Sequence, residues 1–300
     1  MQTGILTYKI LLVAVFIAIS VHHTMGQTKL HVITKTVEKS FTASSSTNLR
    51  IEGQKATVKV NTWNKNEVKV VLKLISKSPE KEKAEKELAY QRYILEKRKE
   101  TIYLKNYLTL PKTVSKLGSI QVASYEVTVP RGCKMEVFNQ YGDVNISNLF
   151  GVINLEVKYG KIRLENLNAA LQVQSYFGDL IMRNIDGQID VTANHTKINL
   201  EDIAGDVRLQ STLGDVFIGN IEDIKTLEIT ASKADITLEN PDYQQFNFSL
   251  VSKFGDVLVP PKYEKYFKPQ EGDNKSFVYK PVAKGNLISL RTSFGNIVAK

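Results

Sequence analysis

The sequence has very few of the residues that build metal sites and disulfide frameworks. Its 300 residues include one cysteine and four histidines, and only His31 and His195 lie beyond the first 26 residues. One cysteine excludes a disulfide framework and any cysteine-built zinc or iron–sulfur cluster within the chain. Two histidines leave little for a metal site or for a base that activates a nucleophile. We therefore expect no catalytic, metal-binding or cofactor-binding residues.

The chain also lacks an apolar run long enough to cross a bilayer. Its longest run, residues 10–19, has ten residues, whereas a membrane-spanning helix needs about 20. Lys9 precedes this run and small residues follow it, which is typical of a secretory signal peptide. We predict a signal peptide over residues 1–26, cut before Gln27; a cut after Ser20 and a retained N-terminal anchor are the alternatives. The mature chain is then exported to the periplasm, the outer surface or the medium, without a transmembrane segment.

The densest run of charged residues lacks charge of a single sign, although the chain has a net charge of +9. Residues 79–100 interleave Lys with Glu, so no basic stripe forms there. We therefore expect no nucleic-acid partner. Apolar residues make up 42% of the chain and charged residues 24%, and these ordinary values exclude wholesale disorder.

What the sequence does contain is a repeat in its second half. A short phrase recurs, in which an aromatic residue precedes glycine, aspartate and an aliphatic residue. The first steps are 18 residues long, and the later ones lengthen to 20, 21 and 40. The copies, including degenerate ones, begin at Tyr141, Tyr159, Phe177, His195, Leu213, Lys233, Phe254 and Phe294.

Each period holds two short strands of alternating apolar residues, separated by turns. Two strands cannot shield an apolar face alone, but stacked coils bury their faces in one continuous core. The pattern predicts an all-β fold in which residues 133–300 form a parallel β-solenoid with about 18 residues and two strands per coil. Glycines mark both turns, where we expect them to adopt positive φ. One set is Gly151, Gly187 and Gly205, and the other is Gly142, Gly160, Gly178 and Gly214.

Residues 27–132 are predicted to form a less regular β region. Alternating apolar residues indicate several strands, and Trp63 lies at a turn between two of them. Ser78 followed by Pro79 and Glu80 is typical of a helix start. We predict one charged, solvated helix near residues 79–100.

Stacked coils place equivalent side chains in columns about 4.8 Å apart. We interpret one column as a structural ladder of inward-turning amides that hydrogen-bond along the axis. It comprises Asn148, Asn166, Asn184, Asp202, Asn220 and Asn240.

Two further columns flank the turn glycine. The residues after it alternate Asp143, Lys161, Asp179, Lys197 and Asp215, which favours an alternating-sign ladder over a calcium site. The residues before it, Tyr141, Tyr159, Phe177 and His195, form an aromatic stack along one edge. Packing is the simpler interpretation of this stack, and a glycan-stacking strip is the functional one.

Three segments resemble a known family. The recurring Tyr/Phe-Gly-Asp-Val phrase, residues 127–130 (Val-Thr-Val-Pro) and residues 61–68 (Asn-Thr-Trp-Asn-Lys-Asn-Glu-Val) are similar to those of the bacterial putative-adhesin family. The resemblance extends from Leu49 to Lys300. It implies an exported solenoid domain of largely unknown function and carries over no catalytic residues.

These observations favour a non-enzymatic protein of the cell envelope or surface, which acts as a binding and scaffolding module through its solenoid faces. Its partner would be an envelope or surface glycan or another envelope protein. Two alternatives stay open, because fold alone does not determine function. One is a polysaccharide-active enzyme built on a β-helix, and the other is a structural element that polymerises coil to coil.

Overall fold

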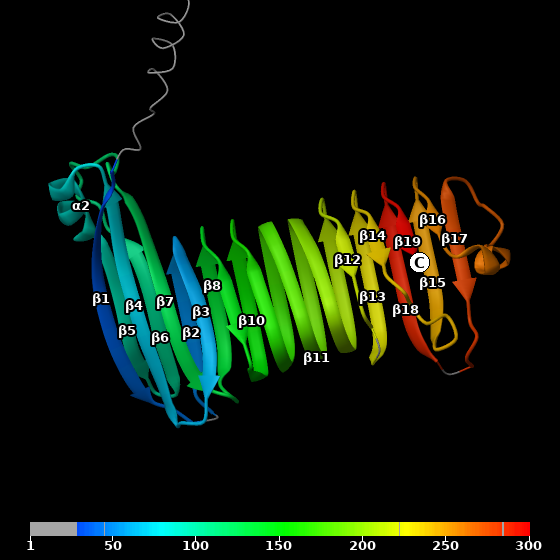
Figure 1. The fold of residues 1–300 in the computed structure, drawn as a ribbon, viewed down its shortest axis with the longest axis horizontal. Helices are drawn as coiled ribbons and strands as arrows, with labels where there is room; N and C mark the ends of the chain where they lie inside the picture. The colour runs from blue at the N-terminus through cyan, green and yellow to red at the C-terminus, as the bar shows by residue number, and fades with distance from the viewer. Residues whose placement is uncertain (1–28, 45, 222, 284) are drawn as a thin grey trace, which may run out of the picture.

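The computed structural model describes residues 29–44, 46–221, 223–283 and 285–300, so the predicted signal peptide lies outside the described residues. The described chain forms an elongated stack of β-coils that flares at the N-terminal end (Figure 1). In this part of the protein, no helix is both long and apolar enough to cross a bilayer.

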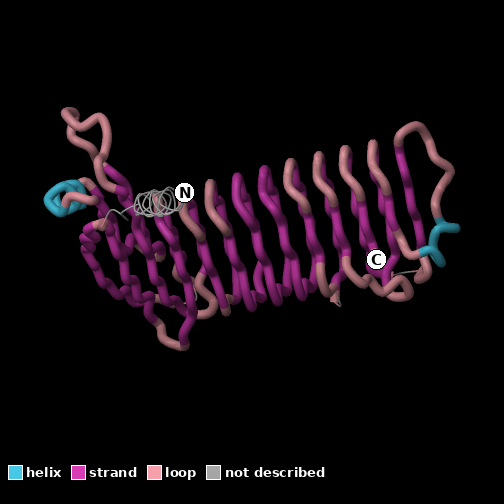
Figure 2. The backbone as a smooth tube through the Cα atoms, turned by 45° about the horizontal axis from the view of Figure 1, so that its top comes forward, coloured by secondary structure: helices cyan, strands magenta, loops and turns pink. Residues whose placement is uncertain are grey.

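The middle of the stack follows the sequence repeat. Parallel pairing joins Val144 to Ile162, Ile153 to Leu171 and Ile198 to Val216, each 18 residues apart. The successive rungs and their corners are visible in Figure 2. The strands are β8 (Lys134–Gln140), β9 (Val144–Ser147), β10 (Phe150–Lys158), β11 (Ile162–Thr212), β12 (Val216–Ile218), β13 (Ile224–Ser232), β14 (Ile236–Leu238), β15 (Phe246–Lys253) and β16 (Val257–Leu258).

The apolar columns of the repeat form the core. One column after the turn glycine is at most 1% exposed at each position, and burial of its side chains stabilises the stack. Because the side-chain period of a strand is two, the same register sends the intervening residues outward. This column comprises Val144, Ile162, Leu180, Ile198 and Val216.

The stack begins earlier in the chain than the repeat does. Strands β2 (Asn48–Gln54) and β3 (Ala56–Trp63) form one more coil, which pairs in parallel with β8 and β9. Leu49 faces Met135 in this pairing, although 86 residues separate them. The chain leaves the stack after this coil, builds the flared end, and returns to continue the stack at β8.

The flared end is largely antiparallel. Strands β1 (His31–Thr42), β4 (Glu67–Ser78) and β7 (Ile120–Pro130) form one antiparallel sheet, and β5 (Gln91–Arg98) pairs antiparallel with β6 (Thr101–Leu108). Strands β6 and β7 then pair in parallel with β2 and β3. The flared end therefore caps the first coil of the stack.

The predicted helix over 79–100 is wrong in its extent. Helix α2 spans Lys81–Leu88, with Glu80 at its N-cap, and β5 follows it. In β5 the buried Leu95 pairs with Leu104 of β6, so strand pairing overrides the helical propensity of the Lys- and Glu-rich segment. Burial opposes ionisation of Glu87, but hydrogen bonds from Gly118 and Ser119 outweigh it and lower the pKa of this carboxyl.

The last coils are not stacked in chain order. Strands β18 (Asn286–Ser293) and β19 (Ile297–Ala299) lie between the β13–β14 coil and the β15–β16 coil, as the red ribbon in Figure 1 shows. Strand β17 (Asn274–Tyr279) pairs antiparallel with β15, and the 3-10 helix η2 (Pro261–Tyr266) precedes it. The end of the chain is therefore an interior coil of the stack.

The all-β prediction is confirmed, and the fold is solenoid-like, but the sheet is mixed. Parallel pairing holds between neighbouring coils, whereas antiparallel strands cover one end and part of the other. The repeat could not indicate these end strands, because they do not share its phrase.

The geometry of one corner of the coil explains why glycine recurs in the repeat phrase. A Cβ on Gly160 would lie 2.1 Å from the carbonyl oxygen of Gly142, and one on Gly178 would lie 2.0 Å from that of Gly160. Contrary to expectation, these glycines do not adopt positive φ; the residue before each of them does, with Tyr159 at 58°. At these positions glycine is therefore required by the close approach of neighbouring coils and not by a positive φ. The expected positive φ occurs at the other turn, in Gly151, Gly187 and Gly205.

Gly178→Ala should destabilise the stack. Its methyl group must displace the Gly160 carbonyl, and overpacking of this kind costs about 1–3 kcal/mol. Ala56, Thr196 and Ala234 occupy the same column in other coils and carry a Cβ, so we expect the variant to fold. Urea unfolding would measure the decrease in the free energy of unfolding. Gly219→Ala is the matched control, because its nearest neighbour would lie 3.4 Å away and its stability should not fall. Equal losses in both variants would contradict the close-approach argument.

Candidate functional site

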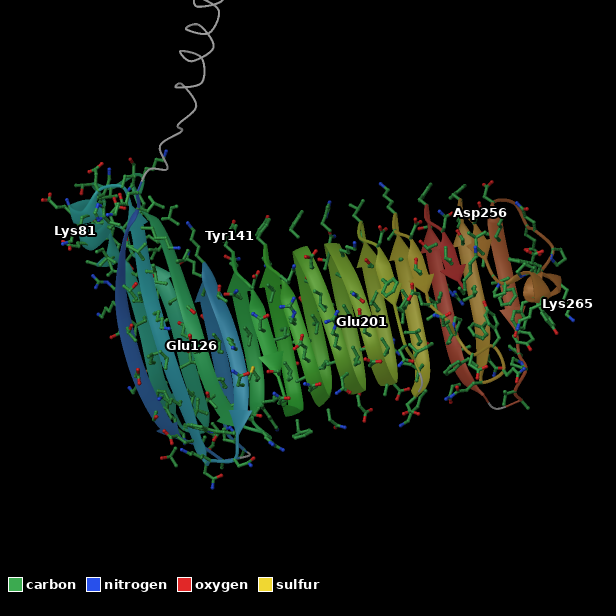
Figure 3. All side chains as sticks on the ribbon, viewed as in Figure 1. Lys81, Glu126, Tyr141, Glu201, Asp256 and Lys265 are labelled. Carbon is green, nitrogen blue, oxygen red and sulfur yellow. The ribbon has the colours of Figure 1, made fainter. Side chains whose placement is uncertain are left out.

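The aromatic corner is the ridge formed by the residues that precede the glycine column. The ring centroids of Tyr141, Tyr159, Phe177 and His195 are 4.9, 5.0 and 4.7 Å apart in succession, and adjacent planes differ by 5°, 9° and 19°. The three aromatic residues are 46–54% exposed. Tyr141 stands on the rim of the stack in Figure 3. The structure therefore brings the predicted strip together as one continuous stack.

The geometry of this corner favours packing over sugar stacking. A pyranose ring packs on the face of an aromatic ring, but here each face is turned toward the ring of the next coil. Solvent meets mainly the ring edges. Along the same corner, Phe294 of the inserted coil stacks on Phe254 at 4.8 Å, so the pattern recurs where two coils far apart in the chain become neighbours.

A buried polar column lies behind this corner and was missed by the sequence analysis. The hydroxyl groups of Ser211, Ser252 and Thr292 donate to inward-facing corner carbonyls at 2.7–3.0 Å. Asn139 donates to the carbonyls of Ala56 and Gly142 in the same way. An unpaired buried carbonyl would be costly, so this column supports the corner. The signal that could have found it is the position two residues before the corner residue, which is polar in most coils although the neighbouring inward-facing columns are apolar.

The acidic residues after the glycine are also used within the stack. The Oδ1 atom of Asp143 accepts a hydrogen bond from the backbone N–H of Lys161 at 2.8 Å, and Asp215 accepts one from Asp235 at 3.1 Å. Lys161 also forms an ion pair with Asp179 at 3.0 Å, in line with the expected alternation of charge. Among the described residues, no group of three or more Asp, Glu, His or Cys could hold a metal ion.

The predicted amide ladder lies at the second corner of the coil, but its side chains face solvent rather than the core. Asn166 donates to the Oδ1 atom of Asn148 at 3.3 Å, Asn184 donates to Asn166 at 2.8 Å, and Asn220 donates to Asp202 at 2.8 Å. These residues are exposed, and all of them except Asn220 have positive φ, as Asn240 does. Asn and Asp occupy the corner because they tolerate the left-handed conformation better than other non-glycine residues.

A charged cluster lines a depression of about 400 Å³ where the flared end meets the stack. Arg50 contacts Glu52 and Glu136 at 3.0 Å each, and its guanidinium lies 4.7 Å from the Phe138 ring centroid. The hydrogen bond from Lys105, at 2.7 Å, lowers the pKa of Glu52. Every charge in this group has an opposite partner, so the cluster leaves no charge free for a ligand.

The single thiol is a structural group. Cys133 is fully buried and donates to the carbonyl oxygen of Thr47 at 3.3 Å. Burial raises its pKa to about 12, so the thiolate that a nucleophile needs is scarce at neutral pH. His195 lies in the aromatic corner beside Phe177, as its repeat position predicts.

The fold and its ladders define a class of all-β, solenoid-like proteins whose outward side chains repeat in register. The chain belongs to the Toastrack DUF4097 family, whose model matches residues 27–299, and this match confirms the family resemblance seen in the sequence. No curated protein matches the chain.

A crystal structure described as a putative cell adhesion protein from Clostridium sporogenes is 11% identical, with 91% of this chain and 99% of that chain covered. The TM-score is 0.23, which is too low to support an argument about fold or function.

If the aromatic corner is chiefly structural, its rings should contribute to stability. Tyr159→Asn removes two ring stacks, whereas Leu213→Asn changes the same column where no ring stacks. Asn tolerates positive φ at both positions. We expect Tyr159→Asn to lower the free energy of unfolding by about 1–2 kcal/mol more than Leu213→Asn does, measured by urea unfolding. A difference near zero would mean that the stacked rings do not hold the corner.

Proposed function

We propose that this protein is an exported, non-enzymatic module of the cell envelope that binds a glycan or another envelope protein. It binds by displaying repeated side chains on the faces and corners of its coils. Export is supported by the signal-peptide pattern, and the family supports a solenoid-like fold.

The observation that carries the proposal is the in-register display of polar and charged side chains. Neighbouring coils pair residue for residue, so chemically similar groups recur at the strand spacing of about 4.8 Å. Hydrogen bonds between coils hold these groups in place before any ligand arrives. Such preorganisation lowers the entropic cost of binding a polymer that carries its own repeat.

The surroundings of the acids support binding rather than polysaccharide cleavage. A glycosidase needs one carboxylic acid whose pKa is raised so that it can protonate the leaving group. Here the hydrogen bonds from Lys105 and Arg50 lower the pKa of Glu52. Cations beside an acid stabilise its charged form, which is the opposite of what a general acid requires.

The capped ends support a discrete module rather than a filament. Coil-to-coil polymerisation needs an open coil at each end of the stack. Antiparallel strands close one end through β7 and β4, and β17 closes part of the other. Both caps depart from the parallel register in which the next coil would have to add.

Binding should be detectable with the mature chain, residues 27–300. We expect saturable binding to at least one component of a glycan array or of a purified envelope fraction, with a Kd between about 1 μM and 1 mM. Heat-unfolded protein is the control, since binding should require the register of the coils. Absence of any partner would contradict the proposal. Release of oligosaccharides that a single Asp or Glu substitution abolishes would establish the enzymatic alternative instead.

A further inference from the structure

A polar groove runs along the second corner of the first coils. Two rows of side chains from successive coils line a depression of about 470 Å³. We call it the amide groove. One row is Thr62, Asn148, Asn166 and Asn184, and the other is Arg131, Phe150, Asn168 and Asp186.

Hydrogen bonds between coils position the residues of both rows. The Thr62 hydroxyl donates to the carbonyl oxygen of Asn148 at 2.9 Å, which places the β2–β3 coil at the end of the first row. In the second row, the N–H of Phe150 donates to the carbonyl oxygen of Arg131 at 2.8 Å, and Phe150 pairs with Asn168. The groove therefore forms only when the coils stack. It includes the β2–β3 coil, which lacks the repeat phrase.

The Asn side chains of the groove have unused hydrogen-bonding capacity. Each Asn side chain carries two N–H donors and an acceptor oxygen, and the bonds within the first row use one donor each from Asn166 and Asn184. In the second row, Asn168 donates to Asp186 at 3.0 Å. The remaining donors and acceptors are exposed and recur at the coil spacing. Sugar hydroxyl groups, which both donate and accept, complement such a row.

Phe150 contributes an exposed ring and Arg131 a positive charge, and together they indicate which class of ligand the groove binds. Phe150 is 45% exposed, and its ring stacks on no other ring among the described residues, in contrast to the rings of the aromatic corner. It can therefore present a face to a sugar ring. Arg131 is exposed and forms no ion pair within the described part of the chain. An unpaired guanidinium beside sugar-binding groups suits a carboxylate, which it can hold with two parallel hydrogen bonds.

We propose that the amide groove binds an acidic polysaccharide along the axis of the stack. Arg131 pairs with a carboxylate of the polysaccharide, Phe150 packs on a neighbouring sugar ring, and the Asn side chains of the two rows bond to hydroxyl groups. This inference rests on the proposed function, for which it names the site and the ligand class.

The test is calorimetric titration of the mature protein with alginate oligosaccharides as the carboxylated probe. Neutral cello-oligosaccharides and poly-glutamate are the comparison ligands, because the first lacks charge and the second lacks sugar. We expect alginate to bind more tightly than either, and its affinity to fall as salt is added. Arg131→Gln and Phe150→Ala should each weaken alginate binding about tenfold.

Arg291→Gln is the matched control, since Arg291 is an exposed arginine on β18 without an ion pair in the described residues. It should change the affinity less than twofold, and all variants should unfold within about 2 °C of the parent protein. The inference would be overturned if Arg131→Gln and Arg291→Gln weakened alginate binding equally, or if poly-glutamate bound as tightly as alginate. Either result would show that the net positive charge alone is responsible for binding. If the neutral oligosaccharides bound as tightly as alginate, the assignment of an acidic polysaccharide as the ligand would be wrong.

The two proposals can fail separately. If alginate or another glycan binds but the groove variants bind as tightly as the parent, the groove is excluded and the binding function stands. If neither a glycan nor an envelope component binds the parent protein, the proposed function fails and the groove assignment fails with it.

Discussion

The structure depends on the close approach of each coil to the next. Parallel strands of neighbouring coils pair residue for residue, and at the aromatic corner the backbone of one coil packs directly against a carbonyl of the other. This approach leaves no room for a Cβ at most coils, so glycine recurs. The buried carbonyls that result need donors, which the interior Ser, Thr and Asn side chains supply. One geometric constraint thus determines the glycine, the residue before it and the polar column behind it.

The same constraint turns outward side chains into ladders, and the chemistry of each ladder decides its role. Aromatic rings in register cover one another's faces, so they stabilise the corner and present edges to solvent. Amides in register also bond to one another, but each keeps a donor or an acceptor free. A stack that is uniform in backbone geometry can therefore be structural at one corner and available for ligands at the other.

The sequence predicted the middle of the fold because each coil there repeats a local phrase. The apolar columns, the aromatic stack and the amide column all follow from the 18-residue step. Prediction failed where long-range pairing decides the structure. The β2–β3 coil lies 86 residues from its neighbour in the chain, and β5 is a strand only because β6 lies beside it. The amide corner faces solvent because the left-handed conformation, rather than burial, selects Asn there.

The order of the final coils tests the account most directly, because stacking in register places β18 between β13 and β15. Glu228 pairs with Ser289, which in turn pairs with Ser249, so Glu228 and Ser249 are two strand spacings, or about 9.6 Å, apart. A disulfide cannot bridge Cα atoms more than about 7 Å apart. Under mild oxidation, Glu228→Cys with Ser289→Cys should form a disulfide detectable by mass spectrometry, and Glu228→Cys with Ser249→Cys should not. The reverse result would contradict the inserted coil.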